Sequence, residues 1–550
     1  MTSSIRRDNP EPNSAARLSP GKRDLALGVA YVSLFAVLVL LVSAPLVDLS
    51  RIHLGPPDRH LNDQVGYITA ARTLSQTGRL QSHIIYPSTL YQKTTKDYLY
   101  LPGHYYALAA SYSIFRYGIL QSYLPNLAAY LFCAVCLYLI GTRLYSIRLG
   151  FIAAALFILF PINILYAYTG MSEMTMVFSA LLPVLIFIYL PERWRPALGG
   201  LALIIPLLFR ETAIFLVIPL GLLIFRFQKK YLFPAIIFVT ISLAVSGIVL
   251  SSGIATGRPS LLLANIFDER FETVYRDAVA MRSISPEIGD WLPAVAEKIQ
   301  TNLEFLINPV LKLDFSFDLI LFYLVLFLML VNIVVGWRRR EMLLLSSGLF
   351  SFCVFLALLS FYAIFSYRGL RVMLFTLPLS LLGSAQILHS ALAERVSKSA
   401  RAIFRFAPFA LFAGLAVVSL VMTALMANRF TSMDSLDDQN LAFMEQLGHD
   451  DQTLLVAPYE FSLNYVYRHY PVRFSFVPKN RETLELLAQG YAIGSLVLPR
   501  VEFEDHFSAT DFERYGLAYS ETVEYGGEAY LVWRATPGPQ AEAALTGQIP

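Results

Sequence analysis

Repeated hydrophobic stretches constrain this chain more than any other feature of its sequence. A helix needs about 20 mostly apolar residues to cross the hydrocarbon core of a bilayer. The chain has 550 residues, of which 56% are hydrophobic and only 15% charged, more apolar surface than an ordinary soluble protein can bury. The sequence therefore predicts a polytopic α-helical membrane protein. Eleven candidate spans lie at about 24–47, 121–142, 148–166, 171–191, 196–209, 211–226, 231–251, 317–337, 342–364, 370–391 and 403–427.

Four segments decide how many spans the chain has. The first, 24–47, is too long for a signal-peptide core and follows a basic tail at 1–23, so we expect an uncleaved span. The stretches 196–209 and 211–226 are short, and we expect them to be tilted or kinked. Residues 104–118 are rich in tyrosine, which suits a helix in the membrane interface. The expected span count is about 11, with a range of 11 to 13.

Lys and Arg occur mainly in every second short loop. Because such residues concentrate on the cytoplasmic side, this pattern predicts a cytoplasmic N-terminus in the inner (cytoplasmic) membrane. Three polar regions then lie on the outer face, at 48–120, 252–316 and from about 428 onward. The cytoplasmic basic residues are Arg143, Arg148, Arg193, Arg195, Arg226, Lys229, Lys230, Arg338, Arg339, Arg340, Arg395, Lys398 and Arg401.

The polar tail predicts a small α/β domain at 428–536, outside the membrane and after a transmembrane domain at 24–427. Strand-like segments occur at 454–457, 472–477 and 495–498, and helix-like segments at 441–447 and 483–488. Such alternation favours a partly parallel sheet with helical cover. Residues 537–550 are expected to be disordered.

Several classes of function find no support. The net charge of +3 comes without a basic patch, so nucleic-acid binding is not expected. The three cysteines, Cys133, Cys136 and Cys353, lie in apolar segments, where a thiol is usually a small buried hydrophobe. The outer-face histidines lack a metal-ligand spacing, and we expect no catalytic metal.

Candidate catalytic groups lie where polar residues meet the outer membrane face. Asp63 opens a stretch in which Tyr67 recurs at helical spacing, so its carboxylate could act as a base on a lipid-borne substrate. An Asp at a helix start is also an ordinary N-cap, and that alternative remains open. Glu173 begins the span at 171–191, and Arg210 and Glu211 meet at another outer junction, where they could instead form a structural pair.

The first outer loop resembles a known signature. The run Asn62-Asp63-Gln64-Val65-Gly66-Tyr67-Ile68-Thr69-Ala70-Ala71-Arg72, with Gly78, is similar to the first-loop motif of GT-C glycosyltransferases. The nearest resemblance is to bacterial relatives of protein O-mannosyltransferases and of lipid A aminoarabinose transferases. Downstream segments at 100–106, 161–173, 210–212 and 367–371 resemble later outer-face elements of that family in the same order.

The resemblance implies transfer of a sugar from a polyprenyl-phosphate donor to a lipid, protein or glycan acceptor on the outer face, with inversion and with no cofactor. It implies that Asp63 is the base, and a cation must hold the departing phosphate. Arg371 is our first candidate for that cation and Arg368 the second. Each could equally be an interfacial Arg whose charge reaches lipid headgroups. The other expected substrate-binding residues are Tyr67, Glu173, Arg210, Glu211, Tyr100, His104 and Lys93.

Two departures from the family pattern narrow the expectation. Gln64 replaces an acidic second residue, which leaves Asp63 as a solitary base. Tyr100 stands where aminoarabinose transferases have a phosphate-contacting Lys, and Gly103 replaces a second Pro, so an orthologous activity is not expected. The loop at 252–316 is long enough to be a lid or an acceptor-facing segment, or else a solvated amphipathic helix.

Other classes remain as alternatives. A lipid-linked glycan polymerase or ligase would also use donors outside, although it would more typically depend on a large outer loop rich in Arg and His. A transporter is disfavoured because the spans show no internal repeat and their interior is nearly free of Asp, Glu and Lys. A non-catalytic assembly protein of the cell envelope would make Asp63 dispensable.

Overall fold

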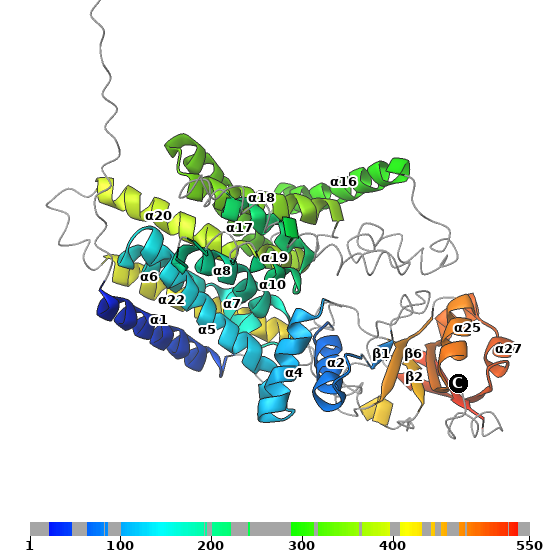
Figure 1. The fold of residues 1–550 in the computed structure, drawn as a ribbon. Helices are drawn as coiled ribbons and strands as arrows, with labels where there is room; N and C mark the ends of the chain where they lie inside the picture. Colours follow the sequence, from blue (N-terminus) through cyan, green and yellow to red (C-terminus); the bar gives the residue numbers. More distant parts are fainter. Residues whose placement is uncertain are drawn as a thin grey trace, which may run out of the picture.

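The computed structural model describes residues 21–46, 63–81, 83–85, 101–191, 193–194, 198, 201–221, 240–241, 288–312, 317–361, 366–395, 407–431, 442–445, 453–458, 472–478, 481–525 and 527–536. A helical bundle formed by the hydrophobic stretches adjoins a smaller sheet domain (Figure 1). The predicted tails at 1–20 and 537–550 and the predicted span at 231–251, apart from residues 240–241, lie outside the described residues.

Four described helices are long and apolar enough to cross a membrane. They are α1 (Lys22–Ser43), α5 (Ile119–Leu144), α17 (Phe317–Arg339) and α18 (Met342–Phe361). Helices α6 (Ile147–Ile158) and α7 (Pro161–Ala167) form a bent pair that could be a fifth crossing. The chain is thus a multi-pass membrane protein, while the predicted count of about 11 spans stays a prediction.

The bend between α6 and α7 is 66° and follows from Pro161, which occupies the first turn of α7. A break in a buried helix frees carbonyl groups that need new donors. Asn163 Nδ2 donates to Phe157 O at 2.9 Å, and Tyr130 Oη donates to Ile158 O at 2.6 Å. These side chains satisfy the carbonyls at the end of α6.

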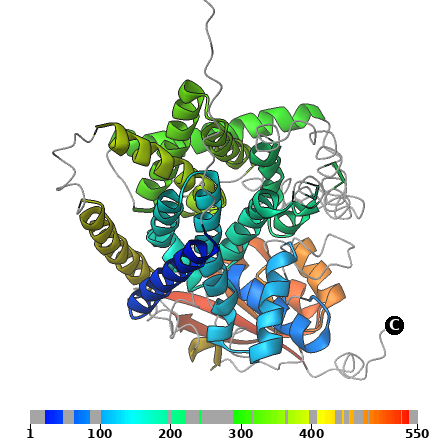
Figure 2. The same ribbon diagram turned by 60° about the vertical axis from the view of Figure 1, so that its left-hand side comes forward.

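Shorter helices complete the bundle. They are α8 (Glu173–Tyr189), α10 (Ile204–Leu207), the 3-10 helix η1 (Glu211–Leu216), α19 (Ser366–Met373), α20 (Leu377–Arg395) and α22 (Ala407–Thr431). Figure 2 shows α22 beside α1 at one side of the bundle. The segment predicted as a span at 370–391 contains two helices, α19 and α20, with a break between them, and its crossing of the membrane stays a prediction.

The outer loop predicted at 252–316 ends in a long helix, α16 (Ile288–Lys312), and residues 252–287 lie outside the described residues. Asn302 Nδ2 donates to Leu359 O at 2.8 Å, which fixes one side of α16 on α18. Leu303, Ile307 and Leu311 are exposed on the helix. Thr301, Glu304, Asn308 and Lys312 are exposed beside them, so the choice between an acceptor-facing segment and a solvated amphipathic helix stays open.

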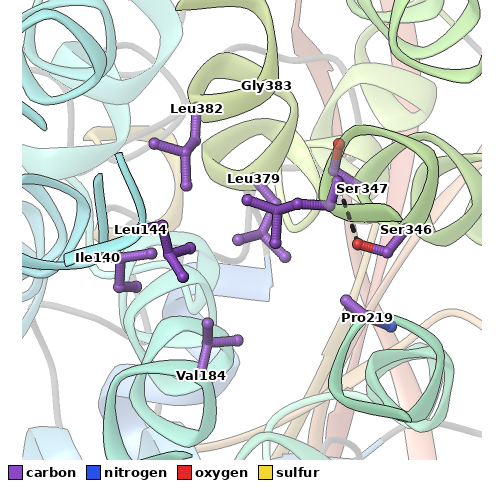
Figure 3. Close-up of a pocket in the computed structure, with 10 residues that line it drawn as sticks. Ile140, Leu144, Val184, Pro219, Ser346, Ser347, Leu379, Leu382 and Gly383 are labelled. Atoms are coloured by element: carbon purple, nitrogen blue, oxygen red, sulfur yellow. Dashed lines mark hydrogen bonds between the residues drawn. The ribbon is translucent and has the colours of Figure 1, made fainter. Parts of the chain in front are cut away.

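A small apolar space lies inside the bundle between α5, α8, α18 and α20 (Figure 3). Leu144 and Leu382 line it, and two serines stand at its wall. The hydroxyl of Ser346 donates to Leu343 O at 2.8 Å and that of Ser347 to Leu344 O at 2.9 Å, so both are satisfied within α18. The space is a packing gap at the C-terminal end of α5.

The sheet has six strands in the order β1-β3-β2-β4-β6-β5. Its strands are β1 (Ile84–Ile85), β2 (Leu454–Ala457), β3 (Arg473–Phe476), β4 (Ile493–Pro499), β5 (Leu517–Tyr525) and β6 (Glu528–Ala535). Strands β1, β3, β2 and β4 pair in parallel, and β6 and β5 add an antiparallel edge. The predicted partly parallel sheet is therefore present, with an unpredicted strand from the first loop.

Helices cover both faces of this sheet. One core contains alternate strand residues with α25 (Arg481–Gly490), α26 (Arg500–His506) and α27 (Ala509–Glu513). The opposite core contains the intervening strand residues with α2 (Asp63–Thr77) and α4 (Gly103–Phe115) of the first loop. With 13 residues, α4 is short for a membrane crossing. The first loop is thus one layer of an α/β/α sandwich.

Candidate active site

The turn at Thr169–Ser172 is the centre of the candidate site. It connects α7 to α8, and its backbone groups lie outside regular helix, so they need partners from elsewhere. Gln64 Oε1 of α2 accepts a hydrogen bond from Gly170 N at 2.9 Å. Asn126 Nδ2 of α5 donates to Thr169 O at 2.7 Å and also to the carbonyl of Met171. The turn is therefore fixed by fully buried amides from two other helices.

His104 of α4 completes this network from a third side. Its Nε2 lies 2.8 Å from Gly170 O and its Nδ1 lies 2.9 Å from Thr175 Oγ1. Because a carbonyl only accepts, Nε2 carries the proton. The Thr175 hydroxyl itself donates to Ser172 O at 2.9 Å, so it connects His104 to the start of α8. Burial lowers the pKa of His104 to about 4, although the hydrogen bond to Gly170 raises it. The ring is therefore neutral near pH 7.

Tyr67 connects α2 to the same turn. Its hydroxyl donates to Ser172 Oγ at 3.3 Å, and its ring meets the ring of His104 edge-on at a centroid distance of 4.9 Å. The ring of Tyr105 lies 5.0 Å away on α4. Two expected substrate-binding residues, Tyr67 and His104, thus lie together beside the start of α8.

Glu173 is the first residue of α8 and is fully buried. It forms an ion pair with Arg371 of α19, in which Arg371 Nε donates to Glu173 Oε1. A carboxylate at a helix N-terminus also interacts favourably with the helix dipole. Its second oxygen, Oε2, is buried and has no hydrogen-bond partner within the part of the chain that the structure describes. The site therefore contains a buried carboxylate oxygen that a donor from a ligand could satisfy.

Arg210 immediately precedes η1 and lies beside the first turn of α8. Its Nη1 is 3.5 Å from the sulfur of Met176, three residues after Glu173. The residue is partly exposed, whereas Arg371 is only 7% exposed. Arg210 also follows Leu208, whose carbonyl accepts from Gly103 N at 2.9 Å at the start of α4. Both guanidinium groups therefore contact residues of the first turn of α8.

For the remaining candidate site residues the structure describes at most the backbone. The backbone of Asp63 begins α2 immediately before Gln64, but the side chains of Asp63, Glu211 and Arg368 lie outside the described residues. Lys93 and Tyr100 lie entirely outside them. Consecutive Cα atoms are about 3.8 Å apart, so the Asp63 backbone lies close to the residue that binds Gly170.

Within the described part of the chain, no group of three or more His, Cys, Asp or Glu side chains could hold a metal ion. The metal-free site remains a prediction because the carboxylates of Asp63 and Glu211 are not among the described side chains.

Sequence reasoning missed the role of three residues of this network. Asn126 is a polar residue inside an apolar span, a feature that usually marks function or helix contact, and this signal could have found it. Gln64 was interpreted as a lost carboxylate, whereas its amide oxygen binds the backbone of the turn. Thr175 follows Glu173 by two residues and had no distinguishing signal.

Comparison with known proteins gives similarity in structure and none in sequence. No family model matches the chain, and no curated protein matches it. A structure of the Archaeoglobus fulgidus oligosaccharyltransferase tethered with an acceptor peptide has a TM-score of 0.51 at 13% identity, over 88% of this chain and 70% of that one. ArnT from Cupriavidus metallidurans in the apo state has a TM-score of 0.51 at 13% identity, over 93% of this chain and 99% of that one.

A second ArnT structure, bound to undecaprenyl phosphate, has a TM-score of 0.50 at 14% identity with the same coverage of 93% and 99%. At such identities the likeness establishes the fold. ArnT and the oligosaccharyltransferase are both GT-C glycosyltransferases. The resemblance predicted from the first-loop motif is confirmed at this level, and the chain has the fold of the GT-C glycosyltransferases.

Proposed function

We propose that this protein transfers a monosaccharide from a polyprenyl-phosphate donor to an acceptor on the outer face of the inner membrane. Asp63 acts as the base and the sugar is transferred with inversion. The observation that carries the proposal is the meeting of the N-terminal end of α2 with the buried Glu173–Arg371 pair at one turn. The backbone of Asp63 thus begins α2 beside the turn that precedes Glu173, and Arg371 is paired with Glu173 at that turn.

The fold supports a lipid-linked donor. One of the similar structures is ArnT bound to undecaprenyl phosphate, and another is an oligosaccharyltransferase tethered with an acceptor peptide. Neither ligand transfers to this chain by similarity alone. The N-terminus then lies in the cytoplasm and the sheet domain outside the membrane, as the distribution of Lys and Arg predicts.

The reaction needs one proton transfer and one displacement. Asp63 removes the proton of the acceptor hydroxyl, and the resulting oxygen attacks C1 of the sugar. The bond between C1 and the phosphate oxygen breaks on the opposite side, and polyprenyl phosphate leaves with the bonding electrons. The unpartnered Oε2 of Glu173 is suited to accept a hydrogen bond from a sugar hydroxyl.

Negative charge grows on the departing phosphate, so cations near it stabilise the transition state. Arg371 is the first candidate. When no donor is bound, the carboxylate of Glu173 offsets the charge of Arg371. The donor phosphate would provide a second anion for the same guanidinium group. Arg368 precedes Arg371 by three residues in α19 and thus lies on the same side of the helix. Arg210, which is partly exposed and contacts Met176 of α8, is a further candidate.

The decisive experiment incubates the purified protein in lipid nanodiscs with a panel of radiolabelled polyprenyl-phosphate monosaccharides, and measures consumption of each donor. Asp63→Asn should remove transfer while the variant stays folded. Asp58→Asn is the matched control, since it removes a carboxylate from the same loop five residues earlier. It should leave transfer unchanged.

Two results would contradict the proposal. Wild-type protein that leaves every donor intact would exclude the function, and an active Asp63→Asn variant would exclude the mechanism. Lipid-linked oligosaccharides belong in the same panel, because their use in preference to monosaccharides would indicate a polymerase or ligase.

A further inference from the structure

The sheet domain is built from two distant parts of the chain. Strand β1 of the first loop pairs in parallel with β3 of the C-terminal region, with Ile84 opposite Phe474. Phe474 N donates to His83 O at 2.9 Å, immediately before β1. The first loop therefore contributes an edge strand to a sheet whose other strands come from residues 454–535.

Helix α2 shares a hydrophobic core with this sheet. Tyr67, Ile68 and Ala71 are buried in the same cluster as Phe474. The other strand residues in this cluster lie on one face of the sheet and are Ile84, Leu455, Ala457, Val497, Tyr530 and Val532, with Val472 immediately before β3. Figure 1 shows α2 between α4 and β1. The sheet packs directly on the helix that begins at Asp63.

Both ends of α2 are tied by hydrogen bonds to different parts of the molecule. At its start, Gln64 and Tyr67 bind the turn before α8. Near its end, the hydroxyl of Thr73 donates to Thr69 O at 3.1 Å and lies 2.9 Å from Nε2 of His83, which adjoins β1. The helix has 15 residues and is about 22 Å long. It therefore connects the sheet to the site as one rigid element.

We propose that the sheet domain takes part in catalysis by positioning α2, and that Phe474 is a positioning residue for the base Asp63. This inference rests on the proposed function. The guanidinium groups of Arg210 and Arg371 come from segments outside the shared core. Loosening the core should therefore slow turnover and leave binding of the donor phosphate unchanged.

The chain provides a matched control for this test. Phe474 and Phe512 are both phenylalanines with no exposed surface, and they lie in the cores on opposite faces of the same sheet. Truncation of either side chain to alanine leaves a cavity of similar size. Only the cavity left by Phe474 lies in the core shared with α2. The variants are Phe474→Ala and Phe512→Ala, with Phe474→Leu and Phe512→Leu as milder forms that are expected to fold if the alanine forms do not.

Kinetics at a temperature where all variants are folded give the first readout. Misplacement of a catalytic group by about 1 Å can cost about 100-fold in rate, so Phe474→Ala should lower kcat by about ten-fold or more. Its affinity for polyprenyl phosphate, measured by titration, should change by less than about two-fold, because the guanidinium groups proposed to hold the phosphate come from segments outside the shared core. Phe474→Leu should recover most of kcat, and Phe512→Ala should keep kcat near the wild-type value.

Hydrogen exchange without donor gives a second readout that does not depend on activity. Phe474→Ala should accelerate exchange in peptides covering 63–77 and 169–175, and Phe512→Ala should accelerate it only on the face covered by α25, α26 and α27. Equal loss of kcat in both alanine variants, or unchanged exchange of α2 in Phe474→Ala, would overturn the inference. If wild-type protein uses no donor, the proposed function fails and the exchange result alone decides whether the sheet positions α2.

Discussion

Glu173 of α8 and Arg371 of α19 form a buried ion pair between residues 198 positions apart in the sequence. Two buried charges are expensive to remove from water, and their attraction mainly offsets this cost. Such a pair is therefore poor evidence for stability as such. Its place beside the turn that binds Gln64 and His104 suggests that it is kept for function.

Variants of this pair should separate stability from activity. Glu173→Leu or Arg371→Met alone leaves one buried charge uncompensated and should destabilise the protein by about 3–5 kcal/mol. The double variant removes both charges and should recover most of that loss, because apolar replacements of buried pairs are often neutral or stabilising. It should still transfer no sugar. Thermal unfolding in detergent and the donor assay measure the two effects, and an active double variant would exclude both residues from the site.

Gln64 should matter through its hydrogen bond to the turn. Gln64→Leu leaves the buried Gly170 N–H without a partner, which should cost about 1–3 kcal/mol of unfolding free energy. Gln64→Glu keeps an acceptor but places an ionisable group where no surface is exposed. Gln76→Leu, at an exposed position of the same helix, is the control for unfolding measurements. Equal stability of Gln64→Leu and Gln76→Leu would show that the Gly170 contact contributes nothing.

Arg210 should contribute to binding of the donor phosphate with little effect on stability, since it is partly exposed. A hydrogen bond to a charged group contributes about 1.5–3 kcal/mol, so Arg210→Ala should weaken binding of polyprenyl phosphate by ten-fold or more. Arg116→Ala removes an exposed arginine at the end of α4 and is the control. Titration of labelled polyprenyl phosphate into nanodiscs measures both affinities. If the two variants bind equally well, Arg210 does not contact the phosphate.

The sequence predicted the elements whose pattern is local. Helices α1, α5, α17 and α18 follow from length and hydrophobicity, and the strands at 454–457 and 473–476 from composition and alternation. The interruption of 370–391 was missed, although Pro378 lies in the first turn of α20 and is typical of a helix start. Strand β1 has two residues and pairs with a strand from the other end of the chain, so no local pattern could reveal it.

The candidate site likewise contains features that follow from a local sequence pattern and features that depend on long-range packing. Glu173 and Arg371 were both expected on the outer face, because ionisable residues at the ends of membrane helices are unusual enough to be noticed. Their contact, and the binding of Gln64 and Asn126 to one turn, depend on how the helices pack. Neither could be derived from spacing along the chain, because the packing determines which backbone groups need a partner.

Helix packing in the bundle should depend on one close approach. A Cβ atom on Gly150 of α6 would lie 2.4 Å from Tyr138 O and 2.5 Å from Thr142 Oγ1 of α5. Because one of these atoms is backbone, Gly150→Ala should cost about 1–3 kcal/mol through overpacking. A Cβ on Gly414 of α22 meets nothing within 4 Å, so Gly414→Ala should be neutral or stabilising by up to about 1 kcal/mol. The unfolding temperature should fall in Gly150→Ala and should stay the same or rise in Gly414→Ala. An unchanged unfolding temperature of Gly150→Ala would contradict the close contact between α5 and α6.

His104 should make stability depend on pH. Burial lowers its pKa from 6.5 to about 4, so the unfolded chain binds a proton more readily than the folded protein between these values. The stability linked to this residue is therefore complete above pH 6.5 and falls as the pH drops toward 4, by about 1.4 kcal/mol for each pH unit. His104→Gln should flatten this part of the profile, whereas His506→Gln, on the exposed end of α26, should keep it. Unfolding temperatures measured from pH 4 to 8 test the prediction, and identical slopes for wild type and His104→Gln would show that this imidazole is not held neutral by burial.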